Sequence, residues 1–298
     1  MIRTESAGFM TGLRRKALLA AALLIALSVS AGCAGAGKEQ TSAEEWHYIQ
    51  FDNTQKVVYD AFRKACADPF SDEPVGFKDE NGEVVRVSVQ ETDTVYQGFL
   101  YDHPECFWLG QTYRYRLSED EDGAGRADAA AVLSVASSLK EQEAMKREFD
   151  AAAREMLDGI PDRGRDGKRA LEIYERLIQG ADYTEEALYD PSMKSEHTAY
   201  GAIVSRGAVC DGFALAYKYL LNAKGIPCIV IPGMSDGQPH VWCTVFWDGQ
   251  WHEADPTWDA CGQESGTVQY FDLTTEEMNR DHTREDSEIA GAVPVSEE

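Results

Sequence analysis

The sequence predicts an α+β fold, and three consecutive stretches between residues 205 and 257 support that prediction. A run with an apolar helical face comes first, a buried strand follows, and a two-stranded hairpin ends the series. A cysteine stands at the start of the helix, while a histidine and an aspartate stand on the hairpin. We expect the helix to pack on an antiparallel sheet, preceded by a smaller α/β accessory region.

Composition places the chain among globular proteins. It has 298 residues, of which 43% are hydrophobic, and its formal net charge is −24. This length suits one or two domains with a substantial core. Because so acidic a protein repels phosphate groups, we expect no nucleic-acid partner. The same charge weakly favours neutral or basic peptides as substrates.

Residues 1–32 have the pattern of a lipoprotein signal peptide. Arg14, Arg15 and Lys16 precede an apolar run, residues 17–29, that is too short to span a membrane. The run ends in Ser-Ala-Gly-Cys, which resembles a bacterial lipobox with Cys33 as the lipidated residue; a signal peptidase site is the alternative. Both predict export. A lipid on Cys33 would anchor the chain to the cell membrane on its extracytoplasmic side, with residues 33–43 as a tether.

Residues 44–142 form the expected accessory region. A helix is predicted from Glu44 to Ala65, and alternating apolar residues predict strands at Val84–Val89 and Tyr113–Leu117. The acidic, glycine-containing stretch Ser118–Asp128 is predicted to be a loop. No catalytic motif falls in this region, so we expect it to position a substrate or a partner.

Residues 143–283 form the expected catalytic domain. Two of its helices are predicted at Met145–Leu157 and Ala170–Ile178, and a glycine follows each of them closely. Residues 284–298 are polar and rich in glutamate, and we expect them to be disordered.

Cys210 stands at the N-terminus of the helix that opens the three stretches. Phe213, Tyr217 and Leu221 follow it at helical spacing, and Gly225 supplies a stop signal. Unpaired backbone N–H groups and the helix dipole favour negative charge at such an end. We therefore expect the thiol of Cys210 to have a lowered pKa and to provide a thiolate nucleophile.

The hairpin places a histidine and an aspartate on one face. An Asp-Gly pair at 248–249 is a strong signal for a two-residue turn, which pairs residue 247 with residue 250. Because side chains alternate between faces, His240, Trp242 and Asp255 then share one face, and His252 lies on the other. Asp255 is within reach of the His240 imidazole in this register. Parity thus selects His240 as a base and rejects His252.

These segments together resemble the bacterial transglutaminase-like domain of the papain-like cysteine-enzyme superfamily. The matching motifs are V-C-D-G-F-A at 209–214, G-I-P-C-I-V-I-P-G at 225–233 and H-V-W-C-T-V-F-W-D-G-Q-W-H-E-A-D-P-T at 240–257. The resemblance implies Cys210 as the nucleophile, His240 as the general base and Asp255 as the residue that orients the histidine. Trp242 and Tyr200 are candidates for lining the substrate pocket.

A Cys-His-Asp triad predicts acyl transfer through a thioester. With water as the acceptor, the protein would be a hydrolase of peptide, protein or cell-wall-linked amides. With a lysine amine as the acceptor, it would be a cross-linking transglutaminase. A non-catalytic binding module at the cell surface is the third hypothesis, and the complete triad favours an enzyme over it. The sequence has no calcium-binding loop of the EF-hand type, and we expect no metal and no cofactor.

The remaining cysteines constrain the redox chemistry. Besides the lipobox cysteine and the nucleophile, five of the seven are left, so at least one stays reduced. Cys228 and Cys243 lie in apolar runs and are predicted to be buried small hydrophobes. A Cys66–Cys106 disulfide stays open as an alternative for an exported protein.

Overall fold

The computed structural model describes residues 44–71, 73–119, 123–261, 268–291 and 293–297. The predicted signal peptide, the predicted lipidation site Cys33 and the predicted tether lie outside the described residues. All the described residues belong to one compact unit. None of the described helices combines the length and the apolar character needed to cross a membrane.

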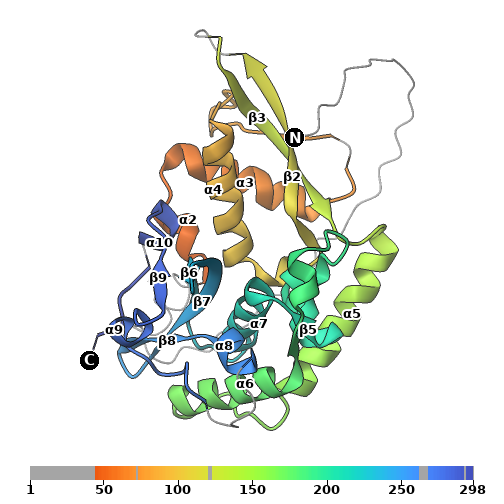
Figure 1. Ribbon diagram of the computed structural model, residues 1–298. Coiled ribbons are helices and arrows are strands. Elements are labelled where there is room, and N and C mark those ends of the chain that lie inside the picture. Colours follow the sequence, from red (N-terminus) through yellow and green to blue (C-terminus); the bar gives the residue numbers. More distant parts are fainter. Residues whose placement is uncertain (1–43, 72, 120–122, 262–267, 292, 298) are drawn as a thin grey trace. The chain divides into compact units, whose positions relative to one another are not determined.

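A four-stranded antiparallel sheet and one helix form the centre of the C-terminal half (Figure 1). The strand order is β8 (Gln250–Ala254), β7 (Gln238–Trp247), β6 (Cys228–Ser235) and β9 (His282–Arg284). Helix α7 (Cys210–Ala223) packs on β6 and β7 through a fully buried apolar face. The fold is therefore α+β, as the sequence predicts.

The hairpin has the predicted register. Trp247 pairs with Gln250, and Val245 pairs with His252. Asp248 and Gly249 both have positive φ, 52° and 87°, as a two-residue turn that follows the strand twist requires. The parity argument is thus confirmed, and His252 lies on the face opposite to His240.

Two long helices pack around α7. These are α5 (Leu139–Met156) and α6 (Asp166–Gly180), and both confirm the predicted apolar periodicity. Phe149, Ile173 and Tyr174 are buried in one cluster with the apolar side chains of α7. The short elements of this half are β4 (Asp182–Tyr183), η2 (Glu185–Leu188), η3 (Ser195–His197), η4 (Gly201–Ser205), β5 (Gly207–Ala208), α8 (Pro256–Cys261), α9 (Thr275–Met278) and α10 (Glu288–Gly291).

The N-terminal region builds a second hydrophobic core. Its elements are α2 (Trp46–Gln50), α3 (Asn53–Ala67), β1 (Val75–Gly76), α4 (Val89–Asp102), the turn η1 (Pro104–Cys106), β2 (Leu109–Glu119) and β3 (Gly125–Ser134). The sheet order is β1-β3-β2, and the β2–β3 hairpin extends beyond α3 and α4 (Figure 1). Helices α3 and α4 pack on each other beside this sheet through Tyr59, Phe62 and Phe99. The thiols of Cys66 and Cys106 meet here with a sulfur–sulfur distance of 2.9 Å and are not joined in a disulfide.

Several predictions in the N-terminal region are wrong. The helix expected from Glu44 to Ala65 is two helices, because Asp52 and Gln55 form a capping box that begins α3. The strand expected at Val84–Val89 is absent from the described residues there, which contain only isolated bridges at Val84 and Val87. Ser88 caps the backbone N–H of Glu91 at 3.1 Å and begins α4, which the alternating valines had concealed.

Strand β2 contains Tyr113–Leu117 as predicted, but much of the expected loop 118–128 belongs to the two strands of a hairpin.

The segment after Arg284 corrects another expectation. The tail expected to be disordered is packed over its described residues: Ile289 and Val293 are each 3% exposed. Ser296 donates a hydrogen bond to the carbonyl oxygen of Trp251 at 2.6 Å. The segment is packed because apolar residues such as Ile289 and Val293 lie between its glutamates in the sequence and are buried in the structure.

A buried ionic network joins the two halves. Lys218 of α7 and Asp102 of α4 are completely buried, and their charged atoms lie 3.8 Å apart. The Asp102 carboxylate also contacts the His47 ring at 2.8 Å and accepts a hydrogen bond from Tyr59 at 2.9 Å. The N-terminal region is therefore tied to the same helix that carries Cys210.

Candidate active site

Cys210 is the first residue of α7, as the sequence predicts. The chain turns sharply at Arg206 before it enters this helix. The φ of Arg206 is 62°, in the left-handed region that non-glycine residues adopt mainly in turns. Val209 precedes the helix without giving it a side-chain cap. Gly212 permits the close packing of the first turn, because a Cβ there would lie 2.3 Å from the carbonyl oxygen of Glu196. These features fix the thiol at an uncapped helix N-terminus.

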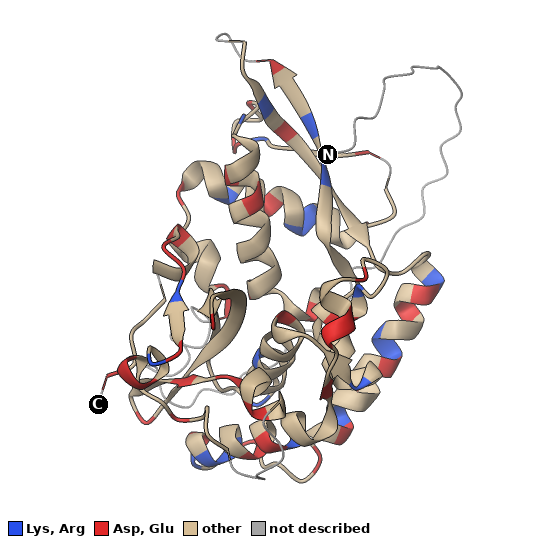
Figure 2. Ribbon diagram, viewed as in Figure 1, with Lys and Arg blue, Asp and Glu red and all other residues tan. Residues whose placement is uncertain are grey.

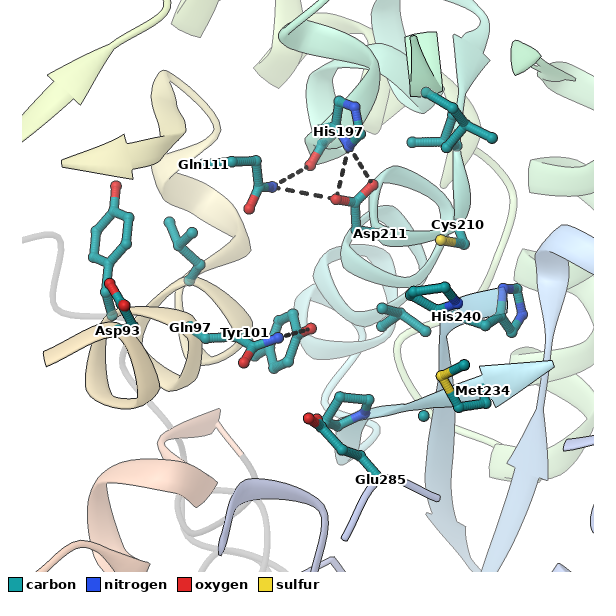
Figure 3. A pocket seen from close by; sticks show the side chains of 18 of the residues that line it. Asp93, Gln97, Tyr101, Gln111, His197, Cys210, Asp211, Met234, His240 and Glu285 are labelled. Atoms are coloured by element: carbon teal, nitrogen blue, oxygen red, sulfur yellow. Dashed lines mark hydrogen bonds and ion pairs between the residues drawn. The ribbon is translucent and has the colours of Figure 1, made fainter. Parts of the chain in front are cut away.

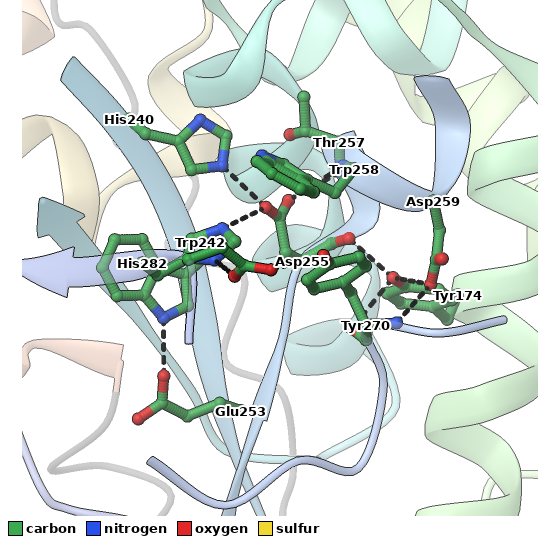
Figure 4. A network of polar contacts seen from close by, with 11 residues as sticks. Tyr174, His240, Trp242, Glu253, Asp255, Thr257, Trp258, Asp259, Tyr270 and His282 are labelled. Carbon is green, nitrogen blue, oxygen red and sulfur yellow. Dashed lines mark hydrogen bonds and ion pairs between the residues drawn. The ribbon is translucent and has the colours of Figure 1, made fainter. Parts of the chain in front are cut away.

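His240 and Asp255 form the predicted contact (Figure 4). The Nε2 atom of His240 lies 2.6 Å from Oδ2 of Asp255, which is fully buried just after β8. The other carboxylate oxygen accepts the backbone N–H groups of Thr257 at 2.8 Å and Trp258 at 3.3 Å. The carboxylate is thus held in one orientation at the start of α8.

This contact determines which nitrogen of His240 can act as a base. A carboxylate accepts hydrogen bonds, so Nε2 carries the proton and the lone pair is left on Nδ1, on the opposite side of the ring. His240 is 8% exposed, and it lines two cavities together with Cys210. The backbone N–H of Val241, next to His240, also faces the Cys210 thiol. The structure therefore brings the three predicted residues to one place.

Two cavities meet at the thiol. One has a volume of about 620 Å³ and lies between α4 and the start of α7, with Gln97 and Tyr101 on the wall opposite Cys210 (Figure 3). The other has a volume of about 790 Å³ and is lined by Tyr183 and Trp258. Both include Cys210, so a chain-like ligand has room on each side of the sulfur.

The pKa of Cys210 contradicts the expectation from the helix terminus. Burial raises the pKa of this thiol to about 12, and the charges of Asp211 and Asp255 add to the increase. The backbone N–H groups of Asp211 and Val241 act in the opposite direction and are outweighed. The thiol is therefore protonated at rest and needs a nearby base to become a nucleophile.

His282 is a site residue that the sequence analysis missed. It begins β9, is 1% exposed, and places its Nε2 atom 3.0 Å from the same Asp255 oxygen that His240 contacts. Burial alone would raise the pKa of Asp255, but the charges and hydrogen bonds of His240 and His282 hold it well below its ordinary value. Only the pairing of β9 with β6 brings His282 here, and the Asp-His pair at 281–282 was the one local signal for it.

The predicted pocket roles of Trp242 and Tyr200 are wrong. Trp242 is completely buried, stacks 6.2 Å from the His240 ring and donates its indole N–H to Glu253 at 2.7 Å. It supports His240 from behind. Tyr200 lines neither of the two cavities that include Cys210 and donates its hydroxyl to Glu148 at 2.6 Å.

His240, Asp255 and His282 also have the donor types of a metal site. Their ligand atoms lie within 4.8 Å of one another, and all three side chains are buried. Protons shared between the imidazoles and the carboxylate account for the same arrangement. The expectation of no metal stays a prediction.

A family model matches the part of the chain that carries the candidate site. Residues 150–256 match the family model of the transglutaminase-like superfamily, and this range includes Cys210, His240 and Asp255. The chain carries a transglutaminase-like domain. His282 lies beyond the matched range of this domain. Cysteine-dependent acyl transfer or proteolysis is the chemistry associated with this class of domain.

Two curated relatives are similar to a short part of the chain. Kyphoscoliosis peptidase of Mus musculus is 28% identical over 79 residues, which are 22% of this chain and 12% of the relative. The Homo sapiens protein of the same name is 31% identical over 61 residues, 16% of this chain and 9% of the relative. The matches thus span about a tenth of the relatives' own length.

Solved structures resemble the chain more distantly. A structure described as a TGase has a TM-score of 0.36 at 14% identity, covering 57% of this chain and 49% of that one. A candidate cysteine protease from Cytophaga hutchinsonii has a TM-score of 0.34 at 12% identity, covering 62% and 70%. Scores this low add nothing to the assignment of the transglutaminase-like domain, which depends on the family model.

Proposed function

We propose that the protein is a cysteine-dependent hydrolase of peptide or amide bonds that works through a thioester intermediate. The observation that supports this most strongly is the hydrogen bond between His240 Nε2 and Asp255. It leaves the basic Nδ1 atom for Cys210, whose buried thiol needs a proton acceptor. The candidate nucleophile, base and orienting residue thus complement one another chemically.

In the acylation step, Cys210 Sγ attacks the carbonyl carbon of the substrate and transfers its proton to His240 Nδ1. The uncapped backbone N–H at the start of α7 stabilises the oxyanion that forms. The carbon–nitrogen bond then breaks, and the imidazolium returns its proton to the leaving amine. Cys210 is left as a thioester of the acyl group.

In the deacylation step, water attacks the thioester and gives a proton to His240 Nδ1. The carbon–sulfur bond breaks, the acyl group leaves as a carboxylic acid, and the sulfur takes back a proton. The cavities on both sides of Cys210 give water and an extended substrate access to the same atoms. A lysine amine in place of water would make the reaction a transamidation.

The substrate class we propose is a neutral or basic peptide. Among the described residues that line the two cavities there is no lysine or arginine, whereas Asp93, Glu285, Glu185 and Asp236 are present. Acidic residues occur along most of the described elements (Figure 2), so acidic side chains beside a cavity are not in themselves distinctive. The absence of lysine and arginine from the described linings is therefore the observation that supports this substrate class. An acidic peptide would meet repulsion on both sides of the nucleophile.

The N-terminal region would then help to position the substrate. Its helix α4 forms the wall opposite Cys210 through Gln97 and Tyr101, which hydrogen-bond to each other at 2.8 Å. Gln97→Ala should raise KM with little change in kcat, because the residue contacts substrate away from the reacting bond. An unchanged KM would remove this role.

The test is a digestion experiment with two readouts. The full-length chain is incubated with a peptide library and a fluorescent primary amine, and products are read by mass spectrometry. New peptide termini support hydrolysis, and amine adducts support transamidation. Cys210→Ala should abolish either product, while Cys106→Ala, which removes a cysteine of the N-terminal region, should not. Turnover that survives Cys210→Ala would overturn the proposal, and peptide binding without any turnover would support a binding module.

We also propose that the protein is exported and lipid-anchored through Cys33 at the extracytoplasmic side of the cell membrane. The basic residues 14–16, the short apolar run and the Ser-Ala-Gly-Cys sequence support this proposal. Metabolic labelling with a radioactive fatty acid should mark the wild type, and Cys33→Ala should lose the label and leave the membrane fraction. A labelled Cys33→Ala protein would contradict the proposal.

A further inference from the structure

Two imidazoles converge on one carboxylate oxygen. Asp255 Oδ2 lies 2.6 Å from His240 Nε2 and 3.0 Å from His282 Nε2 (Figure 4). The second oxygen of Asp255 accepts two backbone N–H groups. Because an acceptor needs a donor opposite it, each of the two Nε2 atoms carries a proton. His282 is therefore a fourth residue, in contact with the Asp255 of the candidate triad.

The second nitrogen of His282 also faces a carboxylate. Its Nδ1 atom lies 2.5 Å from Oδ1 of Asp281, and the other oxygen of Asp281 accepts the Tyr270 hydroxyl at 2.7 Å. A neutral imidazole has only one N–H and could satisfy only one of the two carboxylates. The contacts on both sides thus fit an imidazolium, with a positive charge buried next to Asp255.

We propose that His282 is a positioning residue that holds Asp255 in place and, through its positive charge, keeps His240 neutral and able to accept the Cys210 proton. This inference rests on the proposed function. Asp255 alone would favour a protonated His240, which is not a base. The His282 ring lies 5.3 Å from the His240 ring, so its charge offsets part of that attraction.

The surroundings of His282 agree with a cation at this position. Burial by itself would lower the pKa of His282, but Asp255 and Asp281 outweigh it and raise the pKa above the ordinary value. The titratable groups that face the ring are Asp255, Asp281, His240 and Tyr270, and the indoles of Trp242 and Trp258 complete its surroundings. The nearby Glu253 carboxylate is engaged by Arg284 at 2.6 Å and by the Trp242 indole.

The test replaces His282 with an uncharged donor. His282→Gln keeps an amide N–H able to reach Asp255 but removes the charge. The acid limb of the kcat/KM profile should then move to higher pH by about 2 units, from two charges about 5 Å apart at an effective dielectric constant near 20. In Asp281→Asn, His282 loses one of the two carboxylates that raise its pKa, so it gives up its proton more readily. Part of its positive charge beside His240 is then lost, and the acid limb should move in the same direction by less.

A second readout needs no substrate. NMR of the full-length chain labelled at its six histidines should show both His282 nitrogens protonated at pH 7. It should also show that the midpoint of the His240 titration rises in His282→Gln. His252→Gln is the matched control, because His252 pairs with Asp272 at 2.7 Å on the opposite face of the hairpin. This control should leave both the midpoint and the kcat/KM profile unchanged.

The outcomes separate the inference from the proposed function. If no substrate is turned over by the wild type but the His240 midpoint shifts as described, the inference stands and the hydrolase proposal fails. If the wild type is active and His282→Gln loses activity with no shift of the acid limb or of the midpoint, His282 is only structural and the inference is overturned. Should His282→Gln not fold, the same two measurements on Asp281→Asn decide between these outcomes, because the Asp281 side chain is partly exposed.

Discussion

Replacing His240 with alanine removes the base on which the Cys210 thiol depends. Burial, Asp211 and Asp255 raise the pKa of this thiol to about 12, against an ordinary value of 9.0. At pH 7 the thiolate fraction is then about a thousandfold smaller, although the more basic thiolate is about thirtyfold more nucleophilic. In His240→Ala, Cys210 should therefore react with iodoacetamide about thirtyfold more slowly than a free thiol.

Mass spectrometry of the modified cysteine in the full-length chain measures this rate, with N-acetylcysteine as the reference thiol. In the wild type, proton transfer to His240 should speed the alkylation of Cys210 by about a hundredfold or more over His240→Ala. His252→Ala removes an imidazole from the other face of the hairpin and should react like the wild type. If Cys210 in His240→Ala reacts as fast as N-acetylcysteine, the reasoning from burial is wrong. An equal rate in His240→Ala and the wild type would remove His240 as the base.

Three further outcomes follow from the contacts. Asp255→Asn should lower kcat/KM on a peptide that the wild type cleaves by about 10³–10⁴-fold, because the carboxylate that fixes the His240 tautomer is lost. The pKa of His282 is raised in the folded chain, so its contribution to stability is complete below its ordinary pKa of 6.5 and disappears as the pH rises through the raised value. Urea midpoints of the wild type should thus fall more steeply above pH 6.5 than those of His282→Gln. Lys218→Met leaves the buried Asp102 with less counter-charge and should lower the free energy of unfolding by about 3–5 kcal/mol in urea melts, whereas a loss below about 1 kcal/mol would contradict a buried ion pair.

Local patterns were sufficient for the parts of the fold whose contacts are close in sequence. The helix that begins at Cys210 follows from apolar spacing and a glycine stop signal, and the 240–255 hairpin follows from a two-residue turn. Because the turn fixes the register, parity alone placed His240 and Asp255 on one face and excluded His252. The strand predicted at residues 84–89 was wrong because that prediction also used only a local pattern. A short alternating run is compatible with both a strand and the approach to a helix cap.

Contacts between distant segments could not be read in this way. His282 reaches Asp255 only because β9 pairs with β6, and no periodicity in the sequence encodes that pairing. Trp242 shares the face of His240 as predicted, but the depth of the core makes it a support instead of a pocket wall. The tail after Arg284 is ordered by the sheet that it covers.

The sequence by itself determined the identity of the candidate nucleophile, base and orienting residue, because a helix start and a hairpin register depend on neighbours within a few residues. Only the tertiary structure decided the electrostatics of these groups. The pKa of Cys210 depends on how completely the fold removes water from it, and that of Asp255 depends on a second imidazole brought from a distant strand. Desolvation and charge pairing are properties of the assembled core.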